Sequence, residues 1–220
     1  DRVIPDVDHP RKVILYLHGG YYILFSPTTH RGLTGRIACA AETQVLAIDY
    51  RLAPEHPFPS ALEDAISAYK WLLLQGYDPK NIIIGGDSAG GGLTFATALA
   101  LRDQGQPLPG ALFTLSPWTD LTFSGSSVQE RATRDPILNR EEGRTIAPYY
   151  YAKNDPAHPY ISPVFSDIQG LPPCLIQVGS EEILYDDAAR MNEKLEKAGI
   201  VHWFETWEGM WHVFEFEANL

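Results

Sequence analysis

The chain has 220 residues, of which 45% are hydrophobic and 20% are charged, a composition typical of a globular protein with one sizeable core. Asp and Glu number 28 against 17 Lys and Arg, which gives a formal net charge of -11 at pH 7. This excess of negative charge would repel a phosphate backbone, so nucleic acid is excluded as an expected partner. The apolar runs are strand-sized and far shorter than the ~20 residues that a membrane helix needs, so we expect no membrane span.

Two features bear on the cell compartment. Residues 1–12 lack the apolar centre and the small-residue cleavage site of a secretory signal, which favours a cytoplasmic protein. Cys39 and Cys174 lie in apolar stretches and are interpreted as small core residues rather than as a disulfide.

Short, β-branched apolar runs alternate with segments of helical period along the chain. This alternation is typical of βαβ units and of a parallel sheet that is buried on both faces. It predicts an α/β fold with a mostly parallel sheet of about six strands flanked by helices. The predicted strands lie within residues 12–20, 43–50, 81–86, 110–118, 173–179 and 201–207, and the predicted helices within residues 34–41, 61–74, 92–102 and 186–197.

Residues 120–166 interrupt this alternation with mixed polar residues and several prolines. We expect a lid-like insertion that lies over the carboxyl edge of the sheet. No internal repeat or second domain boundary is visible, so residues 1–220 are expected to form a single catalytic domain.

The sequence Gly86-Asp87-Ser88-Ala89-Gly90 fits the pattern G-x-S-x-G between a predicted strand and a predicted helix. A serine at the tip of such a tight turn needs small neighbours two positions before and two after it, and its hydroxyl then stands clear of the sheet. The alternative is a phosphate-binding glycine loop, but no Lys follows as in G-x-x-x-x-G-K-[ST], and the spacing does not fit a dinucleotide site. The pattern favours Ser88 as a nucleophile.

A serine nucleophile needs a base to accept its proton. In serine hydrolases with this turn the histidine comes last in the chain, which leaves His158, His202 and His212 among the seven histidines. His202 falls inside a predicted strand and His158 inside the insertion, whereas His212 lies on a loop after the last strand. His212 is therefore the predicted base.

Five motifs in this order, "LHGGYY", "DYRLAPEHPFPSALED", "GDSAGGG", "GSEEILYDD" and "EGMWHVF", closely resemble the hormone-sensitive-lipase family of α/β-hydrolase esterases, particularly its bacterial members. The resemblance covers nearly the whole chain. It implies the α/β-hydrolase fold and hydrolysis of short-chain carboxylic esters through an acyl-serine, with a small-molecule ester as substrate and no metal or organic cofactor. It also implies that the chain lacks the N-terminal helical cap and the last helix of the family.

The resemblance assigns the nucleophile to Ser88 and the base to His212. The acid of the triad falls on Glu182 by the spacing of the family, although Glu181, Asp186 and Asp187 follow the same strand. Asp186 and Asp187 open a helix and are expected to cap its N-terminus.

The His-Gly-Gly stretch that begins at His18 corresponds to the oxyanion loop of the family. The resemblance places backbone donors at Gly19, Gly20 and Tyr21, joined by the N–H of Ala89. The family usually has a glycine at the position of Tyr21, and tyrosine there is strained if φ is positive, so we expect a narrower pocket.

The sequence leaves the substrate pocket and the alcohol half of the substrate open. Tyr22, Phe25 and Trp118 are candidates for lining an acyl or alcohol pocket, or for simple packing. The same triad also suits a hydrolase of lactones or of acetyl groups on larger molecules. A non-catalytic binder is a further alternative, because the plant gibberellin receptor resembles this family, but its catalytic histidine is replaced whereas His212 is present here. A monomer or a homodimer is expected.

Overall fold

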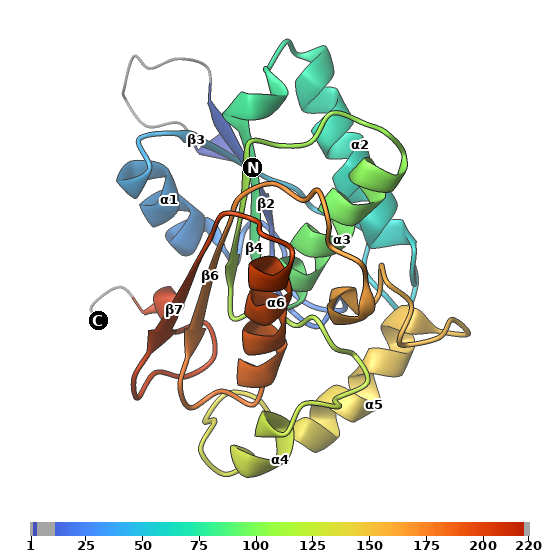
Figure 1. Cartoon of the computed structure of the whole chain (residues 1–220), viewed down its shortest axis with the longest axis vertical. Helices are drawn as coiled ribbons and strands as arrows, with labels where there is room; N and C mark the ends of the chain where they lie inside the picture. The colour runs from blue at the N-terminus through green and yellow to red at the C-terminus, as the bar shows by residue number, and fades with distance from the viewer. Residues whose placement is uncertain (1, 4–11, 218–220) are drawn as a thin grey trace.

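A seven-stranded sheet runs through the computed structural model, which describes residues 2–3 and 12–217 of the chain (Figure 1). The strand order is β1-β3-β2-β4-β5-β6-β7, and every neighbouring pair is parallel except β1 with β3. The strands are β1 (Arg2–Val3), β2 (Val13–Leu17), β3 (Gln44–Ala47), β4 (Ile82–Asp87), β5 (Ala111–Leu115), β6 (Cys174–Gly179) and β7 (His202–Trp207).

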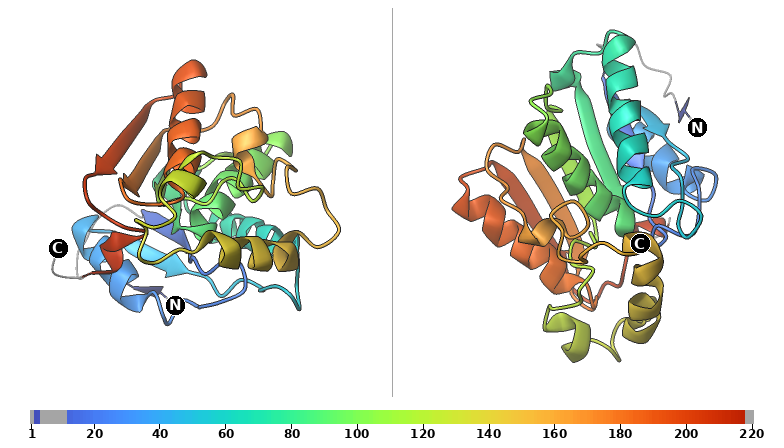
Figure 2. Two further views of the ribbon diagram at one scale, coloured as in Figure 1. Left: turned by 90° about the horizontal axis from the view of Figure 1, so that it is seen from below. Right: turned by 90° about the vertical axis from the view of Figure 1, so that its right-hand side faces the viewer.

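Helices cover both faces of this sheet, as Figure 2 shows. The helices α2, α3 and α6 pack on one face and share a core with Val13, Leu15 and Leu17 of β2. The helix α1 packs on the other face, where its Leu33 and Ala38 join a smaller core. The helices are α1 (Arg31–Ala40), α2 (Ser60–Leu74), α3 (Ala89–Asp103), α4 (Ser127–Glu130), α5 (Arg140–Tyr151) and α6 (Tyr185–Lys197), with short 3-10 turns η1 (Pro79–Asn81), η2 (Pro163–Phe165) and η3 (Phe214–Phe216).

The interior strand β2 shows why a buried parallel strand has a clear signal in the sequence. All five of its residues are buried, because a central parallel strand is covered on both faces and its apolar run is therefore continuous. The six predicted strands and the mostly parallel α/β sheet are confirmed. The additional strand β1 pairs through Arg2 with Leu46 and through Val3 with Val45 at the edge of the sheet.

The helix α3 begins at Ala89, three residues before the predicted start at residue 92. Gly90 and Gly91 therefore belong to the helix, although glycine has a low helix propensity. Tertiary packing overrides that propensity here, because a Cβ atom at Gly90 would lie 2.6 Å from the carbonyl oxygen of His18 and one at Gly91 2.9 Å from Pro117. The glycines allow the start of this helix to lie directly against two neighbouring segments.

The segment between β5 and β6 contains α4, α5 and η2 and lies beyond the carboxyl ends of β6 and β7 in Figure 1. The first turn of α6 holds this segment in place. Asp187 accepts the N–H groups of Thr119 and Asp120, each at 2.7 Å, and Asp186 accepts the N–H of Ser127 at 3.0 Å.

The prediction that Asp186 and Asp187 cap their own helix is therefore wrong, since α6 begins without a side-chain cap. Their carboxylates bind N–H groups of the inserted segment instead. In the described part of the chain, none of the helices is both long and apolar enough to cross a membrane.

Candidate active site

Ser88 stands at the turn between β4 and α3 with φ 51° and ψ −120°, a backbone region that a non-glycine residue occupies only where the surroundings enforce it. Gly86 and Gly90 make this turn sterically allowed. A Cβ atom at Gly86 would lie 2.6 Å from the carbonyl oxygen of Gly90. The prediction that small residues two positions to either side make room for the serine is confirmed.

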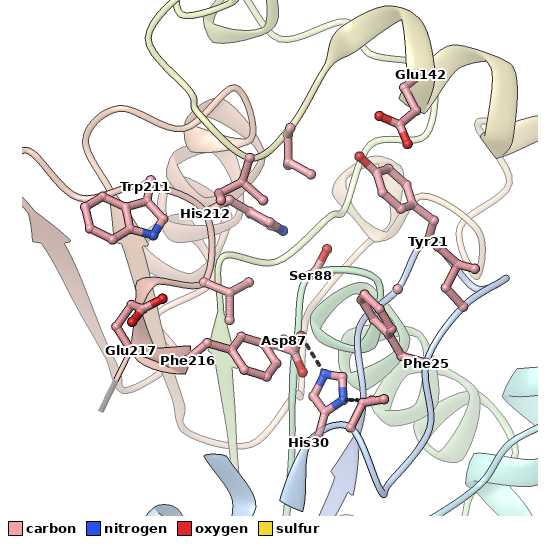
Figure 3. A pocket seen from close by; sticks show the side chains of 16 residues that line it. Tyr21, Phe25, His30, Asp87, Ser88, Glu142, Trp211, His212, Phe216 and Glu217 are labelled. Carbon is pink, nitrogen blue, oxygen red and sulfur yellow. Dashed lines mark hydrogen bonds and ion pairs between the residues drawn. The ribbon is translucent and has the colours of Figure 1, made fainter. Parts of the chain in front are cut away.

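His212 lies on the loop after β7 and is 7% exposed. Its Nδ1 atom is 2.9 Å from Oε2 of Glu182, so the other ring nitrogen is free for a different partner. Figure 3 shows this side of the ring and the hydroxyl of Ser88 facing each other across one cavity that both residues line. The geometry thus brings together the three residues that the resemblance pointed to.

Two other histidines considered from the sequence lie elsewhere. The His158 ring accepts the N–H of Tyr160 at 3.1 Å, and Nδ1 of His202 contacts the carbonyl of Ile200 at 2.7 Å. Neither lines the cavity at Ser88.

Glu182 is completely buried, and both of its carboxylate oxygens have partners. Oε1 accepts hydrogen bonds from the hydroxyl of Ser116 at 2.6 Å and from the N–H of Gly179 at 2.5 Å. The other oxygen, Oε2, is the one that contacts His212. The Ser116 hydroxyl also accepts the N–H of Val213, the residue after His212, at 3.0 Å. Ser116 therefore fixes both the acid and the histidine loop, a role that the sequence did not reveal.

Glu181, the neighbouring carboxylate, turns away from the histidine. It forms an ion pair with Arg134 of the inserted segment, at a partly exposed site where such pairs add little stability.

The pKa of the His212 imidazole is raised above its ordinary value. Burial alone would lower it, but the hydrogen bond and the negative charge of Glu182 outweigh burial, with smaller contributions from Asp135 and Asp87. A carboxylate that stabilises the imidazolium in this way makes the imidazole a stronger base.

Gly20 and Tyr21 line the cavity at Ser88, and Ala89 is the first residue of α3. The N–H groups at the start of a helix have no partner within the helix and favour nearby negative charge. Two predicted donors of the oxyanion hole, Gly20 and Tyr21, therefore line the cavity at Ser88, and the third, Ala89, follows Ser88 in the chain.

Gly19 does not fit this role. Its N–H donates to Oδ1 of Asp87 at 3.1 Å, so it fastens the loop to the end of β4 rather than facing the cavity. The expectation that Gly19 is an oxyanion donor is corrected by this hydrogen bond.

Asp87 is buried and connects several parts of the site. Besides Gly19, it accepts the hydroxyl of Tyr16 at 2.7 Å, and its other oxygen is 3.3 Å from Nε2 of His30. Burial would raise the pKa of this carboxyl, but His30 and Tyr16 outweigh it and lower the pKa. Asp87, the residue before Ser88, therefore anchors the loop that begins at Gly19.

Tyr21, at the loop position where the resemblance leads us to expect glycine, has φ 57°, and Phe25 in the same loop has φ 72°. The expected strain at Tyr21 is thus present, because positive φ is disfavoured for a residue with a large side chain. Burial and the charges of Glu142 and Asp135 raise the pKa of the Tyr21 hydroxyl, which stays protonated at neutral pH.

Two cavities meet at Ser88. The large cavity has a volume of about 470 Å³, and the small cavity about 10 Å³. Ser88, Tyr21 and Leu138 line both of them. The large cavity is also lined by Gly20, Leu24, Phe25, Thr29, His30, Asp87, Ile137, Glu142, Trp211, His212, Val213, Phe216 and Glu217, and the small cavity by Trp118, Phe123, Asn139, Gly143, Ile183 and Leu184.

The three candidate pocket residues fall in different places. Phe25 lines the large cavity and Trp118 the small one. Tyr22 lines neither, because its ring is buried and stacked on Tyr150 with a centroid distance of 3.7 Å. The interpretation of Tyr22 as a packing residue fits this position.

No three His, Cys, Asp or Glu side chains within residues 12–217 are grouped so that they could hold a metal ion.

A family model described as the alpha/beta hydrolase fold matches residues 14–216. This chain belongs to the alpha/beta hydrolase fold family. An acetyl-hydrolase of Streptomyces hygroscopicus is 48% identical over 205 residues, which cover 93% of this chain and 69% of that protein. An esterase of Acinetobacter venetianus is 41% identical over 205 residues, which cover 93% of this chain and 68% of the other.

Solved structures agree with this membership. The crystal structure of an esterase from the bacterial hormone-sensitive lipase family has a TM-score of 0.95 at 47% identity and covers 97% of this chain and 72% of its own. The crystal structure of EstE5 soaked with p-nitrophenyl butyrate has a TM-score of 0.96 at 44% identity and covers 100% of this chain and 74% of its own. The predicted relationship to the bacterial hormone-sensitive-lipase esterases is confirmed, and this alpha/beta hydrolase is an enzyme of the esterase class.

Proposed function

We propose that this alpha/beta hydrolase is a serine carboxylesterase that cleaves short-chain acyl esters through an acyl-Ser88 intermediate. The observation that carries the proposal is the shared cavity of Ser88 and His212, with Glu182 at 2.9 Å from Nδ1 of His212. A nucleophile, a base and a group that orients the base are the elements of the serine-hydrolase triad.

In the first half of the reaction Ser88 Oγ attacks the carbonyl carbon of the ester, and its proton passes to Nε2 of His212. The C=O bond becomes a C–O⁻ single bond, and the resulting oxyanion accepts hydrogen bonds from the backbone N–H groups of Gly20, Tyr21 and Ala89. When the C=O bond re-forms, the bond to the alcohol oxygen breaks and this oxygen takes the proton from His212. The alcohol leaves, and the acyl group stays on Ser88.

In the second half His212 takes a proton from a water molecule, whose oxygen attacks the acyl-Ser88 carbon. The second oxyanion collapses, the bond to Ser88 Oγ breaks, and the proton on His212 returns to Ser88. Glu182 keeps its charge throughout, because it holds Nδ1–H and stabilises the imidazolium at both steps. Preorganised donors of the oxyanion hole contribute ~3 to 4 kcal/mol each in comparable enzymes.

The walls of the site support an uncharged substrate. Aromatic and aliphatic side chains such as Phe25, Ile137 and Trp211 line the large cavity, while its charged groups include Glu142 and Glu217 and, among the described lining residues, neither Lys nor Arg. Apolar walls with few polar groups are typical of small-molecule sites. We propose a neutral small-molecule ester as substrate and a lid-like role for residues 120–166, which supply Ile137, Leu138 and Glu142. A cytoplasmic location and a monomeric or homodimeric state stay predictions from the sequence.

Ser88→Ala tests the proposal, with hydrolysis of p-nitrophenyl acetate as the measurement. We expect kcat to fall by at least ~10⁴-fold with an unchanged melting temperature. Ser166→Ala is the matched control, because Ser166 is also buried but donates its hydroxyl to the carbonyl of Pro163. Retention of activity in Ser88→Ala, or an equal loss of activity in both variants, would refute the assignment of Ser88 as the nucleophile.

A further inference from the structure

Tyr21 lines both of the cavities that meet at Ser88. The ring lies edge-on to Trp118 at a centroid distance of 5.6 Å. On the other side, its Cε1 atom lies 3.8 Å from the place where a Cβ atom of Gly143 would be. The Tyr21 ring therefore contacts both the segment that joins β5 to α4, which contains Trp118, and the helix α5, which contains Gly143. Figure 3 shows its hydroxyl turned towards Glu142 at the edge of the large cavity.

The small cavity is a narrow and mostly apolar space beside Ser88. Its volume is about 10 Å³. A space of about this size is the smallest that holds one water molecule, so the cavity has room for about one group of that size. Trp118 and Phe123 pack against each other at 5.5 Å between ring centroids and close one end. A group the size of a methyl fits this space, and a longer alkyl chain does not.

The large cavity, by contrast, has a volume of about 470 Å³ and opens to solvent past exposed residues such as Leu24, Phe25 and Ile137. Its size suits an apolar group of several carbons. The two halves of an ester leave the carbonyl carbon in different directions. In the proposed mechanism the alcohol oxygen takes its proton from His212, which lines the large cavity and not the small one, so the alcohol half is directed to the large cavity and the acyl half to the small one.

We propose that the small cavity binds the methyl group of an acetyl ester, that the large cavity binds a neutral apolar alcohol, and that Tyr21 sets the limit on acyl length. The inference rests on the proposed function and names the substrate class of the same site. Tyr21 occupies a position that its backbone makes strained, with φ 57°, and the ring it carries there excludes longer acyl chains from the space behind it.

Two isomeric esters test the assignment of the halves to the cavities. Hexyl acetate places the long chain on the alcohol, and methyl heptanoate places it on the acid, while their apolar surface and ester group are the same. Acid release in a pH-stat is expected to give a kcat/KM at least ~10-fold higher for hexyl acetate, the discrimination that a hydrophobic pocket makes for poorly fitting alkyl groups. Equal rates, or faster cleavage of methyl heptanoate, would overturn the assignment.

Variants of Tyr21 test the limit on acyl length, with the ratio of kcat/KM for p-nitrophenyl butyrate to that for p-nitrophenyl acetate as the readout. Tyr21→Gly removes the ring and should join the two cavities. Glycine adopts a positive φ without strain, so the loop should keep its conformation. We expect this variant to raise the ratio at least ~10-fold. Tyr21→Phe keeps the ring and is the matched control, in which the ratio should stay the same.

Phe123→Leu enlarges the small cavity from the opposite wall without touching the oxyanion loop, and it should also raise the ratio. This variant keeps the test valid if Tyr21→Gly does not fold. Failure of both enlarging variants to raise the ratio, or a raised ratio in Tyr21→Phe, would overturn the role of Tyr21.

The outcomes separate the two proposals. If the proposed function is wrong, the wild-type protein hydrolyses none of these esters in a manner that depends on Ser88. If only the inference is wrong, hydrolysis depends on Ser88 but follows neither the isomer preference nor the effect of cavity size.

Discussion

Glu182 Oε2 lies 2.9 Å from Nδ1 of His212, and both side chains are at most 5% exposed. The other oxygen of Glu182 is held by Ser116 and Gly179. A buried carboxylate in this arrangement selects one tautomer of the histidine and leaves Nε2 free, the atom that accepts the Ser88 proton in the proposed mechanism.

Glu182→Gln tests this relationship. The amide keeps the shape but cannot stabilise an imidazolium, so we expect kcat for p-nitrophenyl acetate to fall by ~10² to 10⁴ with the fold intact. Asp186→Asn is the matched control, since Asp186 follows the same strand but binds Ser126 and Ser127. A near-wild-type rate in Glu182→Gln together with an inactive, folded Asp186→Asn would move the acid of the triad to Asp186.

The pH dependence of kcat/KM follows from the raised pKa of His212. His212 must be neutral to accept the Ser88 proton, so kcat/KM should fall as the pH drops through a pKa that lies above the ordinary ~6.5. Because the hydrogen bond and charge of Glu182 raise this pKa, the acid limb of the residual activity of Glu182→Gln should move to lower pH. An acid limb that stays in place in this variant, or wild-type activity that is flat from pH 8 to pH 5, would speak against this coupling.

The stability of the protein should also depend on the protonation of Asp187. Burial, and after it the charge of Asp120, raise the pKa of this carboxyl well above its ordinary value, so the folded protein holds this proton more tightly than the unfolded chain. The stabilisation is fully present below the unfolded pKa of ~3.9 and is lost as the pH rises towards the folded pKa.

Asp187→Asn cannot ionise and should escape this loss. The quantity to compare is the melting temperature of the variant minus that of the wild type at the same pH. For Asp187→Asn we expect this difference to be about 2–4 °C larger at pH 8 than at pH 5. For Asp186→Asn we expect the difference to be the same at both pH values. A relative melting temperature of Asp187→Asn that is constant with pH would show that Asp187 is ionised in the folded protein.

The sheet and its main helices could be predicted from the sequence because their signals are local. A buried parallel strand such as β2 reads as an unbroken apolar run, and the helix α6 follows an amphipathic pattern. The strand β1 has only two residues and carries no such pattern. It is recognisable only through its pairing with β3.

The residues of the candidate site that could be named from the sequence also carry local signals, and the structure places Ser88 and His212 on one cavity. Ser88 is marked by its own neighbours in the chain, and His212 by its order after the last strand. The role of Ser116 depends on a contact with Glu182, 66 residues away, and the position of Tyr21 on both cavities depends on where its ring lies. Neither can be read from a local pattern.

The wrong prediction for Asp187 shows which effect prevails when local and tertiary partners compete. Its position in the first turn of a helix favours a capping role. The N–H groups of Thr119 and Asp120 donate hydrogen bonds to its Oδ2 atom instead, at 2.7 Å each. These donors come from the inserted segment, whose path the sequence pattern does not specify.

The most direct test of the central claim is the site of covalent labelling. A phosphonofluoridate reacts with an activated serine, and peptide mass mapping identifies the residue that carries the phosphonyl group. The proposed mechanism predicts one label, on the peptide that contains Ser88, which is absent in Ser88→Ala and slowed in Glu182→Gln. A label on any other residue of the folded protein, or undiminished labelling of Ser88→Ala, would contradict it.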